Sequence, residues 1–388
     1  MSQSKTHHCP GCSSQVFVGL CRVPRQPVVL NYRYPSATAA RKVKRRDLLL
    51  RQCAECGLIF NSTFDPGAIP YDENYDNRQC FSPAFESYLT GLAGEFIQRH
   101  GLRGQPVLEV GCGKGDFLKL FCRLSEGPGT GYDTTYQGPA RLQRNRIRFH
   151  RRYVYASDIR APHAALLCRH VVEHIGTIGV FLSELRNIAA ACGDPVIVIE
   201  TPRFEWIAEH LCFWDIFYEH CNYFTMPCLA TLCRRAGFTI LRHRATFGRQ
   251  YQVVELKLAR ATGRTLKMKS PAPGASLSKF ASEAESQLGR LEKKLKANGA
   301  GDGWAIWGAG AKGVALVNRL KRNGPRVVVD SNRGKQGGVI PGSSVPVVAP
   351  DDPRLLALGV ILIANPNYAD EIKSVLKQNG FAGKILIL

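Results

Sequence analysis

Four cysteines near the N-terminus have the spacing of metal ligands. They form two CxxC pairs, Cys9 with Cys12 and Cys53 with Cys56. Each pair can place two thiolates on one ion, and four thiolates match the closed tetrahedral site of a structural zinc ion. We therefore expect the first part of the chain to be a small zinc-binding module. The other cysteines are scattered singly, and we expect them to be buried apolar side chains.

A second set of reactive residues lies in the run FWDIFYEHCNYF. His220 beside Glu219 offers a general base with a carboxylate able to tune it, and Tyr218 and Tyr223 flank the pair. The run follows the end of an expected sheet strand, where open α/β sheets bind their ligands. The competing interpretation is an aromatic core helix with one satisfied histidine. We favour the catalytic interpretation because two acids and two tyrosines accompany the histidine.

Two more histidines follow another expected strand, in the segment CRHVVEHI. His170 and His174 are four residues apart, a spacing that could place both on one metal ion. We favour the alternative, in which one of them lines a cleft.

The strongest single motif is EVGCGKG, where a strand ends in Glu109 and a glycine turn precedes a helix. Gly111 and Gly113 let the backbone approach a ligand closely. Asp133 ends the next expected strand, where its carboxylate suits two hydrogen bonds to the hydroxyls of a ribose. An acid beside the turn suits a nucleoside that carries an ammonium group and no phosphates, such as S-adenosylmethionine (SAM). An NAD-binding turn is the less favoured alternative.

This motif resembles the E-x-G-x-G-x-G motif of class I methyltransferases. By the same resemblance, Asp158 in YASDI lies near the adenine of the cofactor, and an acid on a surface loop is an equally weighted alternative.

A second glycine turn, GAGAKG, follows the expected strand WAIW and opens a helix. Gly308, Gly310 and Lys312 belong to this turn, and Asp330 ends the next expected strand. The context is that of a nucleotide-phosphate turn at a helix N-terminus. A substrate nucleotide site and a purely structural Rossmann-like domain are both open interpretations.

The elements around these motifs alternate between short apolar runs and helical segments, which is typical of a doubly wound parallel sheet. We expect an α/β protein with a class I methyltransferase sheet, flanked by the zinc module and a Rossmann-like domain. The expected ranges are 1–72 for the zinc-binding module, 73–260 for the SAM-binding domain and 276–388 for the C-terminal domain.

Composition restricts the class of protein further. No run of about 18 apolar residues predicts a membrane span, and the N-terminus has no apolar signal core, so we expect a cytoplasmic protein. The net charge of +21 is concentrated in clusters such as RKVKRR and RLQRNRIRFHRR. Such an excess favours anionic partners, while a solvated arginine-rich face is the alternative.

The order of all these motifs resembles the nucleotide-sugar C-methyltransferases, over nearly the whole chain. That resemblance implies SAM as cofactor and a keto-deoxy sugar linked to a nucleotide diphosphate as substrate. It implies that His220 abstracts a proton next to the ketone, with Glu219 as its partner and His174 as a cleft histidine. The family's run of tyrosine and serine ahead of the core is altered here to YDENYDNRQCFS, in which Tyr75 is the matching tyrosine. The C-terminal domain would hold the nucleotide, and Tyr223 would contact the substrate.

The chain departs from this family at one catalytic position. The family motif commonly reads Tyr-His-Glu-His, whereas this chain has Phe217-Tyr218-Glu219-His220. The tyrosine that would assist the enolate is therefore absent or shifted by one residue.

Two other functions fit parts of the sequence. A SAM-dependent methyltransferase of another small molecule, acting on oxygen, nitrogen or carbon, is the first. A nucleic-acid methyltransferase fits the charge, but the chain has no proline-proline-tyrosine run and no RNA-binding signature. We expect a small-molecule substrate and no nucleic-acid or membrane partner.

Overall fold

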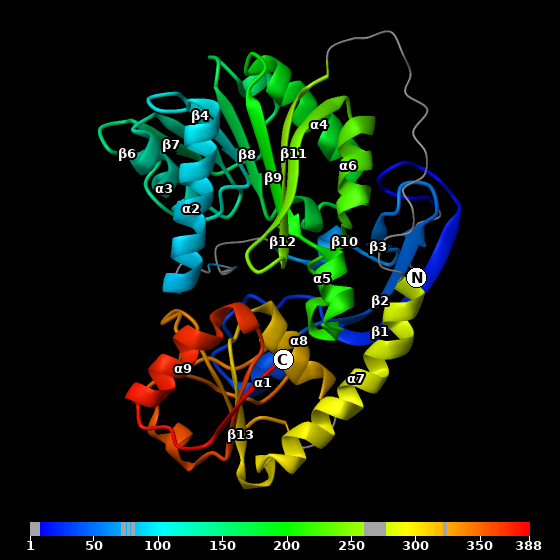
Figure 1. Cartoon of the computed structure of the whole chain (residues 1–388), viewed down its shortest axis with the longest axis vertical. Coiled ribbons are helices and arrows are strands. Elements are labelled where there is room, and N and C mark those ends of the chain that lie inside the picture. The colour runs from blue at the N-terminus through cyan, green and yellow to red at the C-terminus, as the bar shows by residue number, and fades with distance from the viewer. Residues whose placement is uncertain (1–7, 71–74, 76–77, 79–81, 260–276, 321–323) are drawn as a thin grey trace.

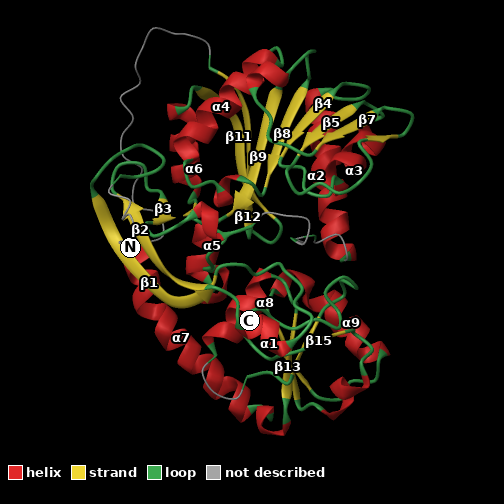
Figure 2. Cartoon of the chain, turned by 180° about the vertical axis from the view of Figure 1, so that it is seen from behind, coloured by secondary structure: helices red, strands yellow, loops and turns green. Residues whose placement is uncertain are grey.

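The computed structural model describes residues 8–70, 75, 78, 82–259, 277–320 and 324–388. These residues form three β-sheets with helices packed around them (Figures 1 and 2). Within them, no helix is long and apolar enough to cross a membrane. The expected domain boundaries near 72 and between 260 and 276 fall outside the described residues, so those boundaries stay predictions.

The N-terminal sheet is antiparallel and has the order β1-β2-β3-β10. Its fourth strand comes from far along the chain, because Asn222 and Tyr223 pair with Phe60 and Ile59. The polar and aromatic run that contains His220 is therefore joined to the N-terminal sheet. The elements of this part are β1 (Phe17–Pro27), α1 (Ala37–Arg41), β2 (Arg45–Cys53), β3 (Ile59–Asn61), η1 (Pro66–Ala68) and β10 (Asn222–Tyr223).

The central sheet has eight strands in the order β11-β12-β9-β8-β4-β5-β7-β6. Its five middle strands are parallel, and the chain winds outward in both directions from the adjacent strands β4 and β8. This is the doubly wound α/β sheet that the sequence predicts, and ligands bind such sheets where the order reverses. The strands are β4 (Val107–Val110), β5 (Gly129–Tyr132), β6 (Arg141–Leu142), β7 (Ile147–His150), β8 (Ala165–Arg169), β9 (Val196–Pro202), β11 (Phe238–Thr246) and β12 (Tyr251–Leu258).

Helices and turns of this region connect the strands and cover the sheet. Buried apolar side chains recur on α3 at helical spacing, so one face of this helix packs on the sheet. The connecting elements are α2 (Pro83–His100), α3 (Asp116–Ser125), η2 (Ala156–Asp158), η3 (Val172–His174), α4 (Ile178–Ala191), α5 (Phe204–Glu209), η4 (Phe213–Asp215) and α6 (Met226–Arg235).

The C-terminal sheet is parallel throughout, with the order β15-β14-β13-β16-β17. Its order also reverses, between β13 and β16, so the predicted Rossmann-like arrangement is present. Its strands are β13 (Trp304–Trp307), β14 (Val327–Val329), β15 (Val347–Val348), β16 (Val360–Ile363) and β17 (Lys384–Ile387). Its helices and turns are α7 (Leu277–Ala297), η5 (Ala300–Asp302), α8 (Ala311–Arg319), η6 (Pro353–Ala357), η7 (Pro366–Tyr368) and α9 (Ala369–Gln378).

One apolar core joins the N-terminal sheet to the C-terminal sheet. It contains Leu48 of β2, Trp206 and Phe213 of the segment after β9, and Ile306 of β13. Helix α7 closes this core and runs along β1, as Figure 1 shows. The segment that leads to His220 is thus enclosed between the two sheets, and this packing fixes where the histidine lies.

Candidate functional site

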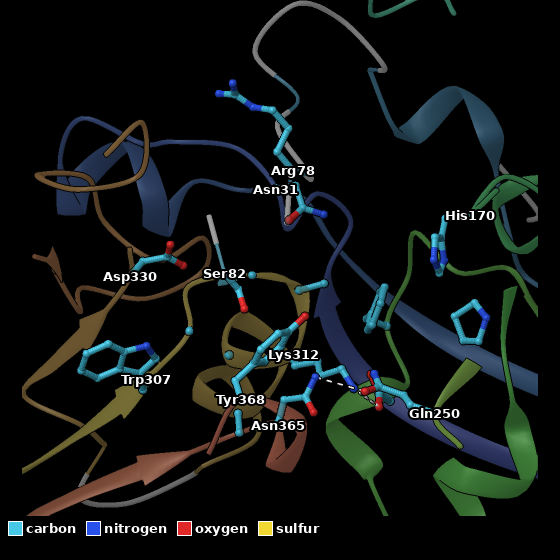
Figure 3. A pocket seen from close by; sticks show the side chains of 18 of the residues that line it. Asn31, Arg78, Ser82, His170, Gln250, Trp307, Lys312, Asp330, Asn365 and Tyr368 are labelled. Atoms are coloured by element: carbon cyan, nitrogen blue, oxygen red, sulfur yellow. Dashed lines mark hydrogen bonds and ion pairs between the residues drawn. The ribbon is translucent and has the colours of Figure 1, made fainter. Parts of the chain in front are cut away.

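A cavity of about 270 Å³ lies between the strand ends of the central sheet and those of the C-terminal sheet. Figure 3 shows Trp307, Lys312 and Asp330 of the C-terminal part facing the same space as His170 and Gln250 of the central part. Both sheets therefore present to one cavity the edge at which α/β proteins bind ligands.

His220 lies in this cavity beside His174, and the two rings are nearly perpendicular with centroids 4.7 Å apart. One ligand atom each from Glu173, His174 and His220 lies within 4.8 Å of the others. His174 Nδ1 donates to the carbonyl oxygen of Glu219 at 2.9 Å, which fixes the orientation of its ring. Three side chains that can gain or lose a proton thus meet at one wall of the cavity.

Burial lowers the pKa of His220 well below its usual value, and the nearby His174, His170 and Lys312 lower it further. An imidazole in these surroundings is uncharged at neutral pH. It therefore has a lone pair with which to accept a proton, which is the property required of a general base.

Glu219 does not tune His220 in the way that the sequence suggests. Its carboxylate is fully buried and accepts hydrogen bonds from the Leu30 amide, the Asn31 side chain at 3.1 Å and the Tyr75 hydroxyl at 2.8 Å. These donors occupy both carboxylate oxygens. The Glu219 side chain therefore binds the N-terminal segment and not the imidazole of His220. Tyr75 lines the cavity and is brought to the site through this contact.

The flanking tyrosines, Tyr218 and Tyr223, are outside the residues that line the cavity. The Tyr218 hydroxyl accepts from the Asp65 amide at 2.9 Å, and the Tyr223 hydroxyl bonds both the amide and the carbonyl of Phe217. Phe217 itself lines the cavity. At this position the cavity wall has an aromatic ring without a hydroxyl.

The first glycine turn follows β4, as predicted, and the half-buried Asp133 holds it. The Gly113 amide donates to Asp133 Oδ2 at 2.8 Å, and the Thr135 amide donates to Oδ1 at 2.7 Å. Gly113 has a φ of +54° and faces open space where a Cβ would stand. A Cβ on Gly111 would approach Val171 to 2.3 Å, so this turn lies against the loop that carries His170.

Glu109 is buried beneath this turn, and its Oε2 has no hydrogen-bond partner among the described residues. Burial raises the pKa of Glu109 to about 8. A carboxyl oxygen without a partner and an open glycine fit a ligand that brings hydrogen-bond donors, as SAM does. The described cavity does not include these residues. Asp158 lies in η2 and pairs with Arg152 at 2.7 Å.

The C-terminal glycine turn repeats the same arrangement. The Ala309 amide donates to Asp330 Oδ2 at 2.7 Å, and the Asn332 amide donates to Oδ1 at 2.7 Å. Gly308 and Gly310 line the cavity, and Lys312 Nζ pairs with the buried Asp215 at 2.6 Å. The two turns therefore share one arrangement. In each, the carboxylate of the acid after the next strand accepts a hydrogen bond from an amide of the glycine turn.

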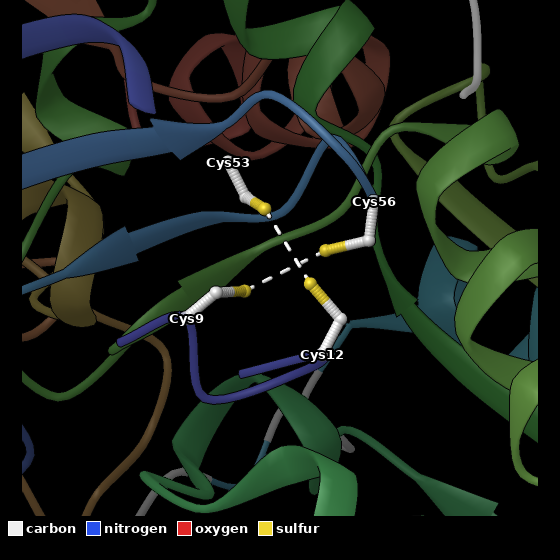
Figure 4. Close-up of side chains that lie close together, drawn as sticks. All are labelled: Cys9, Cys12, Cys53 and Cys56. Atoms are coloured by element: carbon white, nitrogen blue, oxygen red, sulfur yellow. Dashed lines mark hydrogen bonds between the residues drawn. The ribbon is translucent and has the colours of Figure 1, made fainter. Parts of the chain in front are cut away.

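The four cysteines converge as the sequence predicts (Figure 4). The Sγ atoms of Cys9 and Cys56 are 3.6 Å apart, and those of Cys12 and Cys53 are 3.5 Å apart. Zn–S bonds of about 2.3 Å at tetrahedral angles place sulfurs roughly 3.8 Å apart, close to these separations.

Sequence reasoning missed several residues of the cavity. Asn31 and Gln250 belong to no motif, and only the folded chain brings them to the site. Glu173 stood next to His174 in the sequence, and the acid-histidine pair was the signal that could have identified it.

The lowered pKa of His220 predicts how stability depends on pH. In the unfolded chain a histidine takes up a proton near pH 6.5, whereas folded His220 stays neutral to lower pH. Stability should therefore fall as the pH falls below about 6.5, by up to about 1.4 kcal/mol per pH unit from this residue. Urea unfolding between about pH 7 and pH 5.5 measures this change in the free energy of unfolding.

In that experiment His220→Gln should have a shallower pH dependence than the wild type. The exposed His8→Gln is the control and should follow the wild type. Equal slopes for His220→Gln and the wild type would contradict the buried neutral imidazole.

Comparison with known proteins agrees with this architecture. Residues 85–243 match a methyltransferase domain, and residues 238–388 match the C-methyltransferase C-terminal domain. No curated protein matches the chain.

Solved structures that match part of the chain include a methyltransferase and a cyclopropane synthase. The 1,6-didemethyltoxoflavin N1-methyltransferase of Burkholderia thailandensis is 19% identical, with a TM-score of 0.36 over 46% of this chain and 82% of that one. A cyclopropane synthase of Mycobacterium tuberculosis is 13% identical, with a TM-score of 0.36 over 51% of this chain and 92% of that one. By its two matched domains, the chain is a SAM-dependent methyltransferase that carries the C-terminal domain of the C-methyltransferases.

Proposed function

We propose that this enzyme methylates a carbon atom of a keto-deoxy sugar that is linked to a nucleotide diphosphate. The observation that carries the proposal is the shared cavity, which joins the neutral His220 to the glycine turn of the C-terminal sheet. Carbon methylation requires removal of a weakly acidic proton, and a nucleotide sugar requires a phosphate-binding turn at a distance from that base.

SAM would bind at the turn after β4, against Gly111 and Gly113, with Asp133 toward its ribose. When bound, it supplies a methyl group on a positively charged sulfur. The turn packs on Val171, which neighbours His170 in the cavity wall, so the cofactor turn and the cavity share one loop. Glu109 supplies a buried carboxyl group whose Oε2 has no hydrogen-bond partner among the described residues.

The nucleotide half of the substrate would lie on the C-terminal turn. Backbone amides at the N-terminus of α8 attract a diphosphate, and Lys335 adds positive charge to the same wall, while Asp215 balances the charge of Lys312. Asp330 directly follows β14, where an acid of a Rossmann-like sheet bonds a sugar hydroxyl. These contacts would place the keto sugar toward His220.

His220 is the proposed base, with His174 as the neighbouring cleft histidine. Removal of the proton beside the ketone leaves an enolate, whose carbon is the nucleophile. Tyr75 would help to shape this end of the cavity through its bond to Glu219. We leave Tyr218 and Tyr223 out of the proposed site because their hydroxyls bond interior groups.

The four-cysteine cluster would hold a structural zinc ion. Its sulfurs have the separations of a tetrahedral thiolate site, and the cluster lies outside the cavity. Closed thiolate sites contribute directly to folding.

The two glycine turns give a paired test of ligand placement. Asp133→Ala should weaken SAM binding by about 1.5–3 kcal/mol, because it removes a charge-assisted hydrogen-bond acceptor. Asp330→Ala makes the equivalent change in the second turn and should leave SAM affinity unchanged while it weakens binding of a thymidine diphosphate-linked keto sugar. Calorimetry with each ligand would contradict the assignment if Asp133→Ala bound SAM as tightly as the wild type.

Metal analysis tests the zinc site. The wild type should contain about one zinc per chain, and Cys53→Ser should lose it and become unstable or insoluble. Cys192→Ala, a buried cysteine outside the cluster, is the matched control and should keep its zinc. A zinc-free wild type, purified without chelators, would refute the site.

Deuterium exchange tests the base. Incubated in deuterated water without SAM, the wild type should exchange the hydrogen beside the ketone of a thymidine diphosphate-linked 4-keto-6-deoxyhexose. His220→Ala should slow this exchange about 10²–10⁴-fold, the usual effect of removing a general base, with little change in substrate affinity. Exchange at the wild-type rate in His220→Ala would assign the base to another residue, with His174 the next candidate.

A further inference from the structure

His170 has a backbone conformation that a histidine seldom adopts. It directly follows the last residue of β8 and has a φ of +51°, in the left-handed region that favours glycine. Its amide donates to the carbonyl of Glu200 at 2.8 Å, which holds the strained residue in place. Such strain persists where the surrounding structure enforces it, and it is common at active sites. The conformation directs the side chain into the wall of the cavity.

Glu173 orients the imidazole of His170. Nδ1 of His170 donates to one carboxylate oxygen of Glu173 at 3.2 Å, and the Thr201 hydroxyl donates to the other at 3.0 Å. Glu173 is nearly inaccessible to solvent, so its position is fixed. A histidine whose Nδ1 faces a held carboxylate has the geometry of an acid–base dyad.

The second ring nitrogen, Nε2, is buried and has no hydrogen-bond partner among the described residues. The nearest carboxylate, of Glu200, is 3.8 Å away and is bonded to Arg169 and Tyr88. A buried nitrogen without a partner is rare in a purely structural histidine, because burial removes the water that would bond it. Its partner is therefore expected to arrive with a ligand of the cavity.

Enolate formation in the cavity requires a proton donor, and this nitrogen can provide one. Phe217 presents a ring without a hydroxyl, so that position offers no proton to the oxygen of a developing enolate. A donor aimed at this oxygen lowers the barrier to removal of the carbon proton. The carboxylates of Glu173 and Glu200 lie 3.2 Å and 3.8 Å from the two ring nitrogens of His170, whereas burial keeps the ring of His220 uncharged.

We propose that His170, oriented by Glu173, is a second catalytic residue that protonates the carbonyl oxygen of the substrate while His220 removes the carbon proton. This inference rests on the proposed function. The electron pair of the carbon–hydrogen bond becomes the carbon–carbon double bond of the enol, and the carbonyl π pair takes the proton of His170 Nε2. His220 gains one proton and His170 loses one, so the step is balanced and reverses when the ketone forms again.

The test uses His170→Asn, because asparagine tolerates the left-handed backbone but cannot transfer a proton. In the deuterium exchange assay it should slow exchange about 10²-fold or more. The pH profile of the wild type should fall on the alkaline side as the donor is lost, and His170→Asn should lack this fall. His100→Asn, on α2 and outside the cavity, is the control and should match the wild type.

Glu173→Gln tests whether the charge of Glu173 orients His170 or whether its side chain only fills space. It keeps the shape and a bond to Thr201 but removes the charge, so it should slow exchange less than His170→Asn and shift the alkaline fall of the profile. Wild-type exchange rates and an unchanged pH profile in His170→Asn would overturn the proposal.

If the wild type does not exchange the hydrogen of this sugar, the proposed substrate is wrong. NMR of the histidines in the ligand-free protein then tests the pairing of His170 with Glu173 independently. The proposal predicts that His170 carries its proton on Nδ1 and that Glu173→Gln changes the signals of its ring. Ring signals of His170 that do not respond to Glu173→Gln would refute it.

Discussion

The buried carboxylate of Glu219 is the contact on which the arrangement of the cavity depends. A charge inside a protein is tolerated only when several donors satisfy it, and here the donors are the Leu30 amide, the Asn31 side chain and the Tyr75 hydroxyl. All three lie far from Glu219 in the sequence. The same residue accepts from His174 through its carbonyl oxygen. One residue thus positions the N-terminal segment, Tyr75 and a cleft histidine, beside His220.

The pairing of β10 with β3 extends this connection to the N-terminal sheet. Asn222 and Tyr223 follow His220 by only two and three residues, so the strand pair limits where His220 can move. The cysteine cluster holds together the segments at the two ends of the β1–β2 hairpin. A metal ion there would stabilise the sheet that carries β10, which explains how a distant thiolate site can matter to the cavity.

Much of the fold could be predicted from the sequence, because its signals are local. The strand, glycine turn and helix at Gly111 and again at Gly308 occur as expected, and the CxxC pairs converge. The bracing of each turn by Asp133 or Asp330 follows from the same strand-turn-helix geometry. Since consecutive residues of a parallel unit determine these contacts, no distant part of the chain is needed to predict them.

The roles within the FYEHCNYF run could not be predicted in the same way. The run is irregular, so periodicity does not say which side chains face the cavity, and Phe217 and His220 do while Tyr218 and Tyr223 do not. Glu219 was expected beside the imidazole, but donors from residues 30 to 75 attract its carboxylate. The positive φ of His170 is likewise invisible in the sequence, since the side chain alone gives no reason for it.

The central claim is that the cavity serves methylation of carbon. The most direct measurement is an NMR spectrum of the product made with SAM labelled by ¹³C in its methyl group and a thymidine diphosphate-linked keto-deoxy sugar. We expect a labelled methyl with the chemical shift and carbon–carbon coupling of a methyl bonded to carbon. A labelled methyl with the shift of a methoxy or N-methyl group would contradict it.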